Sequence, residues 1–124
     1  MIMNSINLSK TICLSGRDEL YLVNLDLVLY MQADDHYTHI YYTTNHHFLV
    51  PYGLSAIEQM IRDMKDDSVP LMRLGRKYII NLQCIHYVSI LKGSVSLSDL
   101  HGGVVVLHIS KPILRSMSSL FLSK

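Results

Sequence analysis

Three cations fall within five residues of this 124-residue chain, at Arg73, Arg76 and Lys77. An apolar run, residues 78–80, follows them and ends at Asn81. Cationic side chains keep their charged ends in water, whereas the apolar run needs a core. The pattern therefore predicts a firmly anchored loop that points its charge outward, which suits a polyanion. A solvated basic loop without a partner would give the same pattern, so the rest of the chain must decide.

The charge of the chain is divided unevenly between its two parts. Residues 1–68 carry four Lys or Arg and nine Asp or Glu, a net charge of −5. Residues 69–124 carry seven Lys or Arg and one acid, Asp99, a net charge of +6. The overall charge of +1 therefore hides a strongly basic C-terminal part, which predicts an anionic partner. Charge alone leaves nucleic acid, an acidic protein surface and an anionic membrane as alternatives.

The basic side chains differ in what they could recognise. Arg76 carries a planar fork of donors that can pair with O6 and N7 of guanine, although a phosphate contact or a free surface position is also open. Lys77 and Lys92 are point charges, which favours contacts to phosphate. Lys111 lies near the expected N-terminus of a helix, where backbone N–H groups also attract phosphate. Asn81 is expected to bond to backbone and to hold the basic loop in shape.

Patterns that could support metal binding or catalysis are weak. The chain has seven histidines, and none forms a helical His-x-x-x-His pair. His36 and His39 should face opposite sides of a strand, because side chains alternate there. The adjacent His46 and His47 should diverge, and no carboxylate stands at ligand spacing beside any of the four. Since a Gly-rich phosphate loop and a readable Ser, His and Asp order are also missing, we predict no metal site, no cofactor and no enzyme.

Length and composition indicate one domain with one core. A chain with 49% hydrophobic and 17% charged residues is not a disordered chain. Residues 1–9 are expected to be a loose lead-in and residues 10–124 the single domain, without repeats or linkers. No apolar run approaches the roughly 18 residues of a membrane span, and no signal peptide is readable, which predicts a cytoplasmic protein. Cys13 and Cys84 lie in apolar runs, which predicts two buried thiols, with a disulfide between them as the less favoured alternative.

The order of apolar runs and turns predicts a mainly β fold with two short helices. Short alternating runs with polar turns between them are typical of antiparallel strands. The expected strands are 11–14, 19–23, 27–32, 37–43, 47–50, 71–74, 85–91, 94–97 and 104–109. Residues 54–65 show an apolar stripe at helical spacing, with Ser55 as the N-cap and Glu58 completing a capping box. A second helix is expected at 110–122, with Ser110 as its N-cap and Pro112 in its first turn.

Five segments, in order, resemble the LytTR DNA-binding domain of bacterial transcription regulators. The most characteristic is Leu71-Met72-Arg73 followed by Arg76 and by Tyr78-Ile79-Ile80-Asn81. The other four are Asp26-Leu27-Val28-Leu29-Tyr30-Met31, Asp35-His36-Tyr37-Thr38-His39-Ile40, Leu54-Ser55-Ala56-Ile57-Glu58 and Ile109-Ser110-Lys111. The likeness covers about residues 10–122, which is nearly the whole chain.

The resemblance implies stacked small antiparallel sheets and DNA contact through loops, without a recognition helix. It places the contacts in the turn at Asp35-His36, the turn at Gly75-Arg76-Lys77 and the segment after Ser110. By spacing alone His36 would be a solvated turn residue, and the resemblance makes it a candidate for DNA contact. The chain departs from the family in having Gly75-Arg76-Lys77 where His, then Arg or Asn, then Ser is usual. It also has Pro112 where a second cation is frequent.

We therefore predict sequence-specific binding of double-stranded DNA in transcription, through His36, Arg76, Lys77, Lys92 and Lys111. A signalling partner protein and a dimer on repeated half-sites fit this role, whereas a membrane partner does not. The alternative is a protein-interaction module whose basic part docks an acidic partner, and salt-dependent DNA binding discriminates the two. A metal-binding enzyme is a third hypothesis, which metal analysis would settle. The start at Met1 favours a whole protein over an excised domain.

Overall fold

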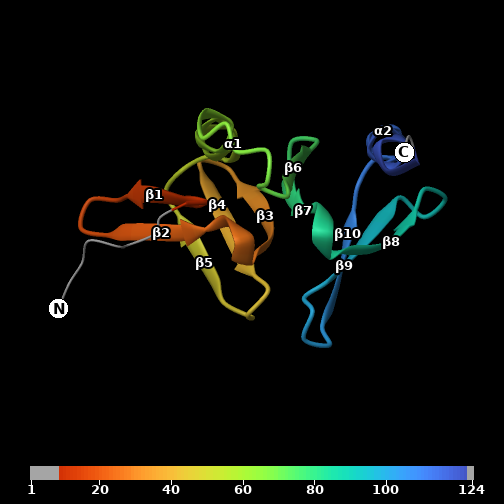
Figure 1. Ribbon diagram of the computed structural model, residues 1–124, viewed down its shortest axis with the longest axis horizontal. Coiled ribbons are helices and arrows are strands. Elements are labelled where there is room, and N and C mark those ends of the chain that lie inside the picture. The colour runs from red at the N-terminus through yellow and green to blue at the C-terminus, as the bar shows by residue number, and fades with distance from the viewer. Residues whose placement is uncertain (1–8, 123–124) are drawn as a thin grey trace.

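Strands dominate the computed structural model, which describes residues 9–122 (Figure 1). In chain order the elements are β1 (Thr11–Ser15), β2 (Leu20–Asn24), the 3-10 helix η1 (Leu25–Leu27), β3 (Val28–Asp34), β4 (Tyr37–Tyr42), β5 (His47–Val50), α1 (Leu54–Asp63), β6 (Leu71–Leu74), β7 (Tyr78–Asn81), the 3-10 helix η2 (Leu82–Cys84), β8 (Ile85–Ser89), β9 (Ser94–Ser98), β10 (Val104–His108) and α2 (Lys111–Leu122). The paired strands run antiparallel in three sheets, β1-β2, β5-β4-β3-β7-β6 and β10-β9-β8. The predicted mainly β fold of stacked small sheets with two helices is confirmed. Of the expected lead-in at 1–9, all but Ser9 lies outside the described residues.

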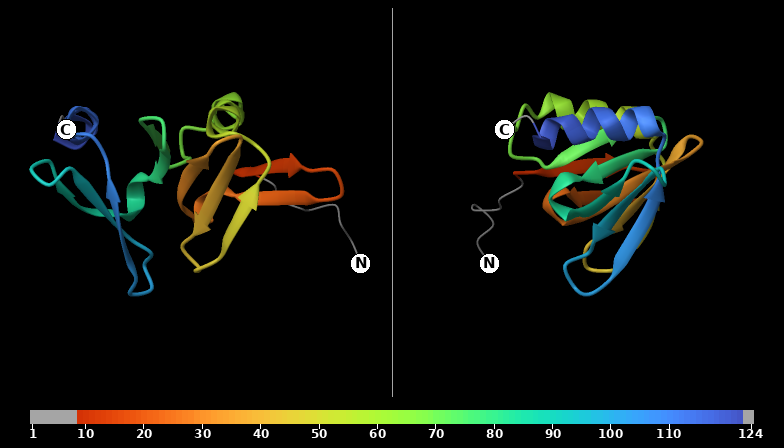
Figure 2. Two further views of the ribbon diagram at one scale, coloured as in Figure 1. Left: turned by 180° about the vertical axis from the view of Figure 1, so that it is seen from behind. Right: turned by 90° about the vertical axis from the view of Figure 1, so that its right-hand side faces the viewer.

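The five-stranded sheet separates two hydrophobic cores. Its central strand β3 contributes Met31 to one core and Tyr30 to the other, and its neighbour β7 contributes Ile79 and Ile80 in the same way. The first core is closed by the β1–β2 hairpin and α1, and the second by the three-stranded sheet and α2. Figures 1 and 2 show both helices on one side of the molecule, each above its own group of strands. The first four residues of β3, Val28–Met31, are buried on both faces, so they form a continuous apolar run without alternation.

Helix α1 begins at Leu54, with Gly53 as its N-cap and no side-chain hydrogen bond at the cap. The predicted capping box of Ser55 and Glu58 is therefore wrong. Leu54 is only 3% exposed, and it reaches the core from within the first helical turn, which moves the cap back to Gly53. The helix ends at Asp63, two residues before the predicted end.

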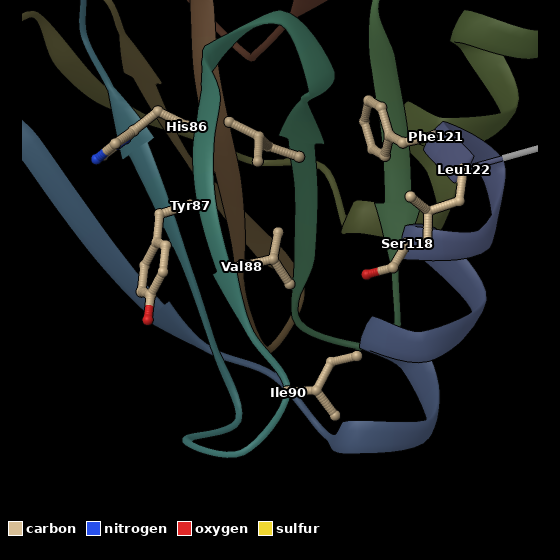
Figure 3. A pocket seen from close by; sticks show the side chains of 8 residues that line it. His86, Tyr87, Val88, Ile90, Ser118, Phe121 and Leu122 are labelled. Atoms are coloured by element: carbon tan, nitrogen blue, oxygen red, sulfur yellow. The ribbon is translucent and has the colours of Figure 1, made fainter. Parts of the chain in front are cut away.

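Helix α2 follows the prediction at its start and departs from it at its end. The amide of Leu114 donates to the carbonyl of Ser110 at 3.0 Å, so Ser110 directly precedes the first turn. Leu114 and Met117 are buried, as the apolar stripe predicts. The same stripe predicts that Leu120 and Phe121 pack on the sheet, but they are 52% and 45% exposed. Phe121 borders a hollow between the last turns of the helix and β8 (Figure 3), and Leu120 borders another one beside β6.

Two corners of the form β–3-10–β repeat the same residues, which corrects the prediction that the chain has no repeats. The runs YLVNLDLVLYM at 21–31 and YIINLQCIHYV at 78–88 share Tyr, Asn, Leu and Tyr at equivalent positions. In each corner the Asn side-chain oxygen accepts from the backbone N–H two residues on and caps the 3-10 turn. Asn24 accepts from Asp26 at 3.1 Å, and Asn81 accepts from Gln83 at 2.9 Å. The repeat is hard to see because most of its apolar positions are substituted.

Asn81 differs from its counterpart Asn24 in being buried, with 3% of its surface exposed. Its side-chain amide also donates to the carbonyl of Val28 at 2.8 Å, and Val28 is the residue that ends η1 in the first corner. The prediction that Asn81 bonds to backbone is confirmed. Its bonds join the two corners, however, and do not shape the basic loop.

The cysteines only partly follow the prediction. Cys84 is buried, and burial raises the pKa of its thiol. Cys13 is exposed, because the alternation of β1 turns it to the outer face of the hairpin while Ile12 and Leu14 face the core. Both thiols are free, so the alternative of a disulfide is wrong. No helix within residues 9–122 has the length and apolar character to span a membrane.

Candidate nucleic-acid interface

The β6–β7 turn holds two of the predicted contact residues, Arg76 and Lys77, and both are exposed. Gly75 opens the turn with a φ of +70°, in the left-handed region that favours glycine. A Cβ at this position would also lie 2.9 Å from Cδ1 of Ile113 in α2. The turn therefore packs closely against the start of the C-terminal helix, and a glycine here allows that approach.

Arg73 does not point outward, which corrects the prediction of three outward cations. Its Nε donates to the carbonyl of Gly75 at 2.8 Å, and a terminal nitrogen donates to the carbonyl of Arg76 at 3.2 Å. Its other terminal nitrogen bonds to Oε1 of Glu58 in α1 at 3.0 Å. The side chain is only 19% exposed. A guanidinium with a carboxylate and two carbonyls in reach is held inward, so Arg76 and Lys77 alone supply the charge of the turn.

The β6–β7 turn and the start of α2 share a small hollow. Its volume is about 110 Å³, and it is lined by residues 74–78, 108–110 and 113. Lys111, the first residue of α2, is exposed next to it. The N-terminus of a helix carries unpaired backbone N–H groups and a partial positive charge, which favour an anion. His108 and Tyr78 also line the hollow, and reasoning from sequence missed both.

Lys92 belongs to a neighbouring turn. The amide of Ile109 donates to the carbonyl of Gly93 at 3.0 Å, which seats the β8–β9 turn against the junction of β10 and α2. Lys92 precedes Gly93 in that turn and is exposed. Three loops that are distant in sequence thus present Arg76, Lys77, Lys92 and Lys111 on one part of the surface.

His36 lies in the β3–β4 turn, with its side chain 91% exposed. The turn is tight, since Asp35 has a φ of 56°. The amide of Ala33 donates to the carbonyl of Lys77 at 2.8 Å, which ties the base of this turn to the basic turn. The side view in Figure 2 shows the β3–β4 turn and the start of α2 along the same side of the molecule. The fold thus gathers the loops of all five predicted residues.

A histidine cluster lies on the same sheet. Nε2 of His39 is 2.9 Å from Oδ2 of Asp34, and Nδ1 of His39 is 2.9 Å from Nε2 of His47. Asp34 at the end of β3 reaches across to His39 in β4, a contact between strands that spacing along the chain does not reveal. Within residues 9–122, however, no group of three or more His, Cys, Asp or Glu side chains is placed to hold a metal ion.

A separate hollow of about 490 Å³ lies between β8 and the last turns of α2. Figure 3 shows Val88, Ile90, Ser118 and Phe121 around it. No Lys or Arg is among the residues that line it, so it does not suit a polyanion. The basic loops, and not this hollow, form the candidate interface.

The fold and the gathered basic loops define a β-rich module that can meet a polyanion with loops instead of a recognition helix. The family description of the LytTr DNA-binding domain matches residues 18–120, and the chain belongs to this family. The chain is similar in structure to a LytTr DNA-binding domain from Bacillus cereus, assigned to a methyl-accepting/DNA response regulator. The two share 20% identity and a TM-score of 0.62 over 90% of this chain and 95% of the other. No curated protein sequence matches the chain.

Proposed function

We propose that the chain recognises specific double-stranded DNA sequences through its loops, as the DNA-binding module of a bacterial transcription regulator. The observation that carries the proposal is the packing of the Arg76-Lys77 turn against the start of α2. This packing brings two exposed cations and a helix N-terminus around one small hollow. A phosphate backbone is the polyanion that such a surface fits.

The five predicted residues divide into three roles in the proposal. Arg76 reads a base edge, because its planar fork of donors matches O6 and N7 of guanine. Lys77, Lys92 and Lys111 contact phosphates, with Lys111 helped by the helix N-terminus. His36 contacts the duplex at a second place, because its turn is separate from the Gly75-Arg76-Lys77 turn.

The small number of contact residues suggests that the module does not act alone. One module with about five contact residues buries little surface, which supports pairing of two copies on repeated half-sites. A partner protein or a further domain would carry the regulatory signal. The role is one of binding, with no reaction assigned to the chain. Its place is the bacterial cytoplasm, where the chromosome lies.

Titration of duplex DNA tests the proposal directly. The protein is titrated with a random-sequence duplex and with sequences selected from a random duplex pool, each at several salt concentrations. The logarithm of the binding constant should fall with the logarithm of salt, with a slope of about −0.9 per phosphate contacted. Absence of binding at low salt, or binding that salt does not change, would refute the proposal and favour an acidic protein partner.

A further inference from the structure

The contacts of Arg73 assign it a part in the basic turn that its charge alone does not suggest. Four hydrogen bonds leave its guanidinium, and two of them end on carbonyl oxygens of the β6–β7 turn, those of Gly75 and Arg76. The other two end on α1, at Oε1 of Glu58 at 3.0 Å and at Oγ of Ser55 at 3.3 Å. The side chain therefore bridges the basic turn and a helix on the core.

We infer that Arg73 is a positioning residue, which fixes the backbone of the β6–β7 turn so that Arg76 is aimed at a base edge, with Glu58 holding Arg73 in place. The inference rests on the proposed function, because it concerns the same surface. Arg73 itself does not touch DNA.

The direction of the two carbonyls explains why such a residue is needed. A carbonyl oxygen that points to solvent beside Arg76 would present a partial negative charge to an approaching phosphate. Arg73 draws both oxygens inward, so that the turn presents its side chains outward. Only a guanidinium offers Nε and both terminal nitrogens in one plane, and a Lys cannot satisfy two carbonyls and a carboxylate with the same geometry.

Glu58 keeps the guanidinium from swinging out toward the anion. Its two oxygens are shared, since Oε1 binds Arg73 at 3.0 Å and Oε2 binds Arg62 at 2.9 Å. Arg62 is 68% exposed, and its guanidinium bonds to Oε2 of Glu58 one helical turn away, on the side of α1 away from the carbonyls that Arg73 holds. Arg62 is therefore a matched control, with the same charge, the same partner and a similar distance.

Three variants separate positioning from simple charge. Arg73→Lys keeps the charge but loses the fork. Glu58→Gln removes an acid, so electrostatics alone predicts tighter DNA binding, whereas loss of positioning predicts weaker specific binding. Arg62→Gln removes a cation beside the same carboxylate. We expect the first two to lower affinity for the selected sequence by about tenfold while nonspecific binding stays nearly unchanged. Arg62→Gln should leave the ratio of specific to nonspecific affinity as in the wild type.

Opposite results would overturn the inference. If Arg73→Lys binds as the wild type and Glu58→Gln binds every duplex more tightly, Arg73 acts as a plain charge. A fourth variant, Arg73→Gln, removes the charge itself. If it lowers the salt slope by about 0.9 on all duplexes alike, Arg73 is a phosphate contact. If Arg73→Lys and Glu58→Gln lower the melting temperature, but at lower temperatures keep the wild-type ratio of specific to nonspecific affinity, Arg73 serves only the fold.

A measurement without DNA keeps the inference separate from the proposed function. The amide of Ala33 donates to the carbonyl of Lys77, so its hydrogen exchange reports whether the basic turn is seated. Arg73→Lys and Glu58→Gln should speed hydrogen exchange at the Ala33 amide. They should not speed exchange at the amides whose hydrogen bonds join β3 to β4. Arg62→Gln should change neither rate. If the wild type fails to bind DNA, the proposed function falls, and this exchange still decides whether Arg73 holds the turn. Unchanged exchange at Ala33 in both variants would refute it.

Discussion

The two β–3-10–β corners are built from matching residues but differ in what their asparagines hold. In the first corner, residues 21–31, Asn24 is exposed, and its side-chain oxygen caps one backbone N–H. In the second corner, residues 78–88, Asn81 is buried and uses both its oxygen and its amide. The same turn sequence is thus a local cap where it is solvated and a joint between two parts of the fold where it is buried.

The joint sets the position of the candidate interface. Asn81 ends β7, which pairs with β3 so that Gln32 lies opposite Tyr78. That register places the β3–β4 turn and the β6–β7 turn side by side at the same end of the sheet's strands. A slip of one residue would turn every side chain of the strand to the other face and would separate the two turns.

The largest effect is expected for Asn81→Ala. The substitution leaves the buried carbonyl of Val28 and the partly buried amide of Gln83 without their partner. Each unpaired group costs about 1–3 kcal/mol, so the free energy of unfolding should fall by about 3 kcal/mol. Chemical denaturation measures it. A loss as small as that of an exposed residue would contradict the joint.

The next largest effect is expected in the basic turn that leads into the second corner. Arg76→Ala should cost about 1–3 kcal/mol on the selected site and relax preference at one base pair, because a guanidinium reads a base edge in one orientation. Lys77→Ala should weaken all duplexes nearly alike and reduce the salt slope by about one unit. Both are exposed, so neither should change the melting temperature. Titrations on the selected site and its single-base variants, at two salt concentrations, measure this. Equal weakening of every sequence by Arg76→Ala would make it a phosphate contact.

Asn24→Ala tests the other side of the comparison. It removes a cap at a solvated turn, where water can replace the lost acceptor, and should cost about 1 kcal/mol. The same denaturation series as for Asn81→Ala gives the value. A cost equal to that of Asn81→Ala would show that the two corners are equivalent and that burial does not matter.

A smaller effect on DNA affinity is expected for His36→Ala, in the turn that follows the first corner. Its side chain is 91% exposed and lies 3.7 Å from the neighbouring Asp35. We expect weaker binding of the selected site than in the wild type, but a smaller loss than for Arg76→Ala. Unfolding should stay cooperative with an unchanged midpoint. A loss of cooperativity would give His36 a structural role instead.

The smallest effect is expected on the pH dependence of the melting temperature, through two acidic residues in turns outside both corners. Backbone N–H groups of His101 and Gly103 lower the pKa of Asp99, and the Ser68 hydroxyl and amide lower that of Asp66. A carboxyl with a lowered folded pKa stabilises the protein above its unfolded pKa and loses this as the pH falls through the folded pKa. The melting temperature should therefore begin to drop below about pH 4. Asp99→Asn keeps the acceptor without the charge and should flatten that drop, whereas Asn24→Ala should leave its shape unchanged.

Local patterns were sufficient to predict most elements of the fold. The β5 strand and β6 strand begin and end where the apolar runs predict, and both helices are present. Elements with one buried face are readable because their apolar residues recur at a fixed period. The cap of α1 was misplaced because a strong local signal, Ser55 with Glu58, competed with the burial of Leu54, and tertiary packing decided.

Contacts between distant segments could not be predicted from the sequence. Arg73 and Glu58 are fifteen residues apart, and no spacing rule joins a strand to a helix across a turn. The bond from Asn81 to Val28 spans fifty-three residues. Matching the runs at 21–31 and 78–88 would have shown that both corners need an Asn, but not which of the two is buried. The gathering of the five candidate residues is supported by the arrangement of their loops, and their contacts with DNA stay a prediction.

The outward position of Cys13 has a practical consequence for measuring this protein. Thiol reagents react with the thiolate, so an exposed cysteine reacts well before a buried one whose pKa is raised. Cys13 should therefore take a maleimide dye while Cys84 stays unmodified in the native state. It lies on the β1–β2 hairpin, which carries none of the five loop residues. The natural sequence thus supplies a single labelling point for fluorescence anisotropy or energy transfer on a dye-labelled duplex, without any engineered residue.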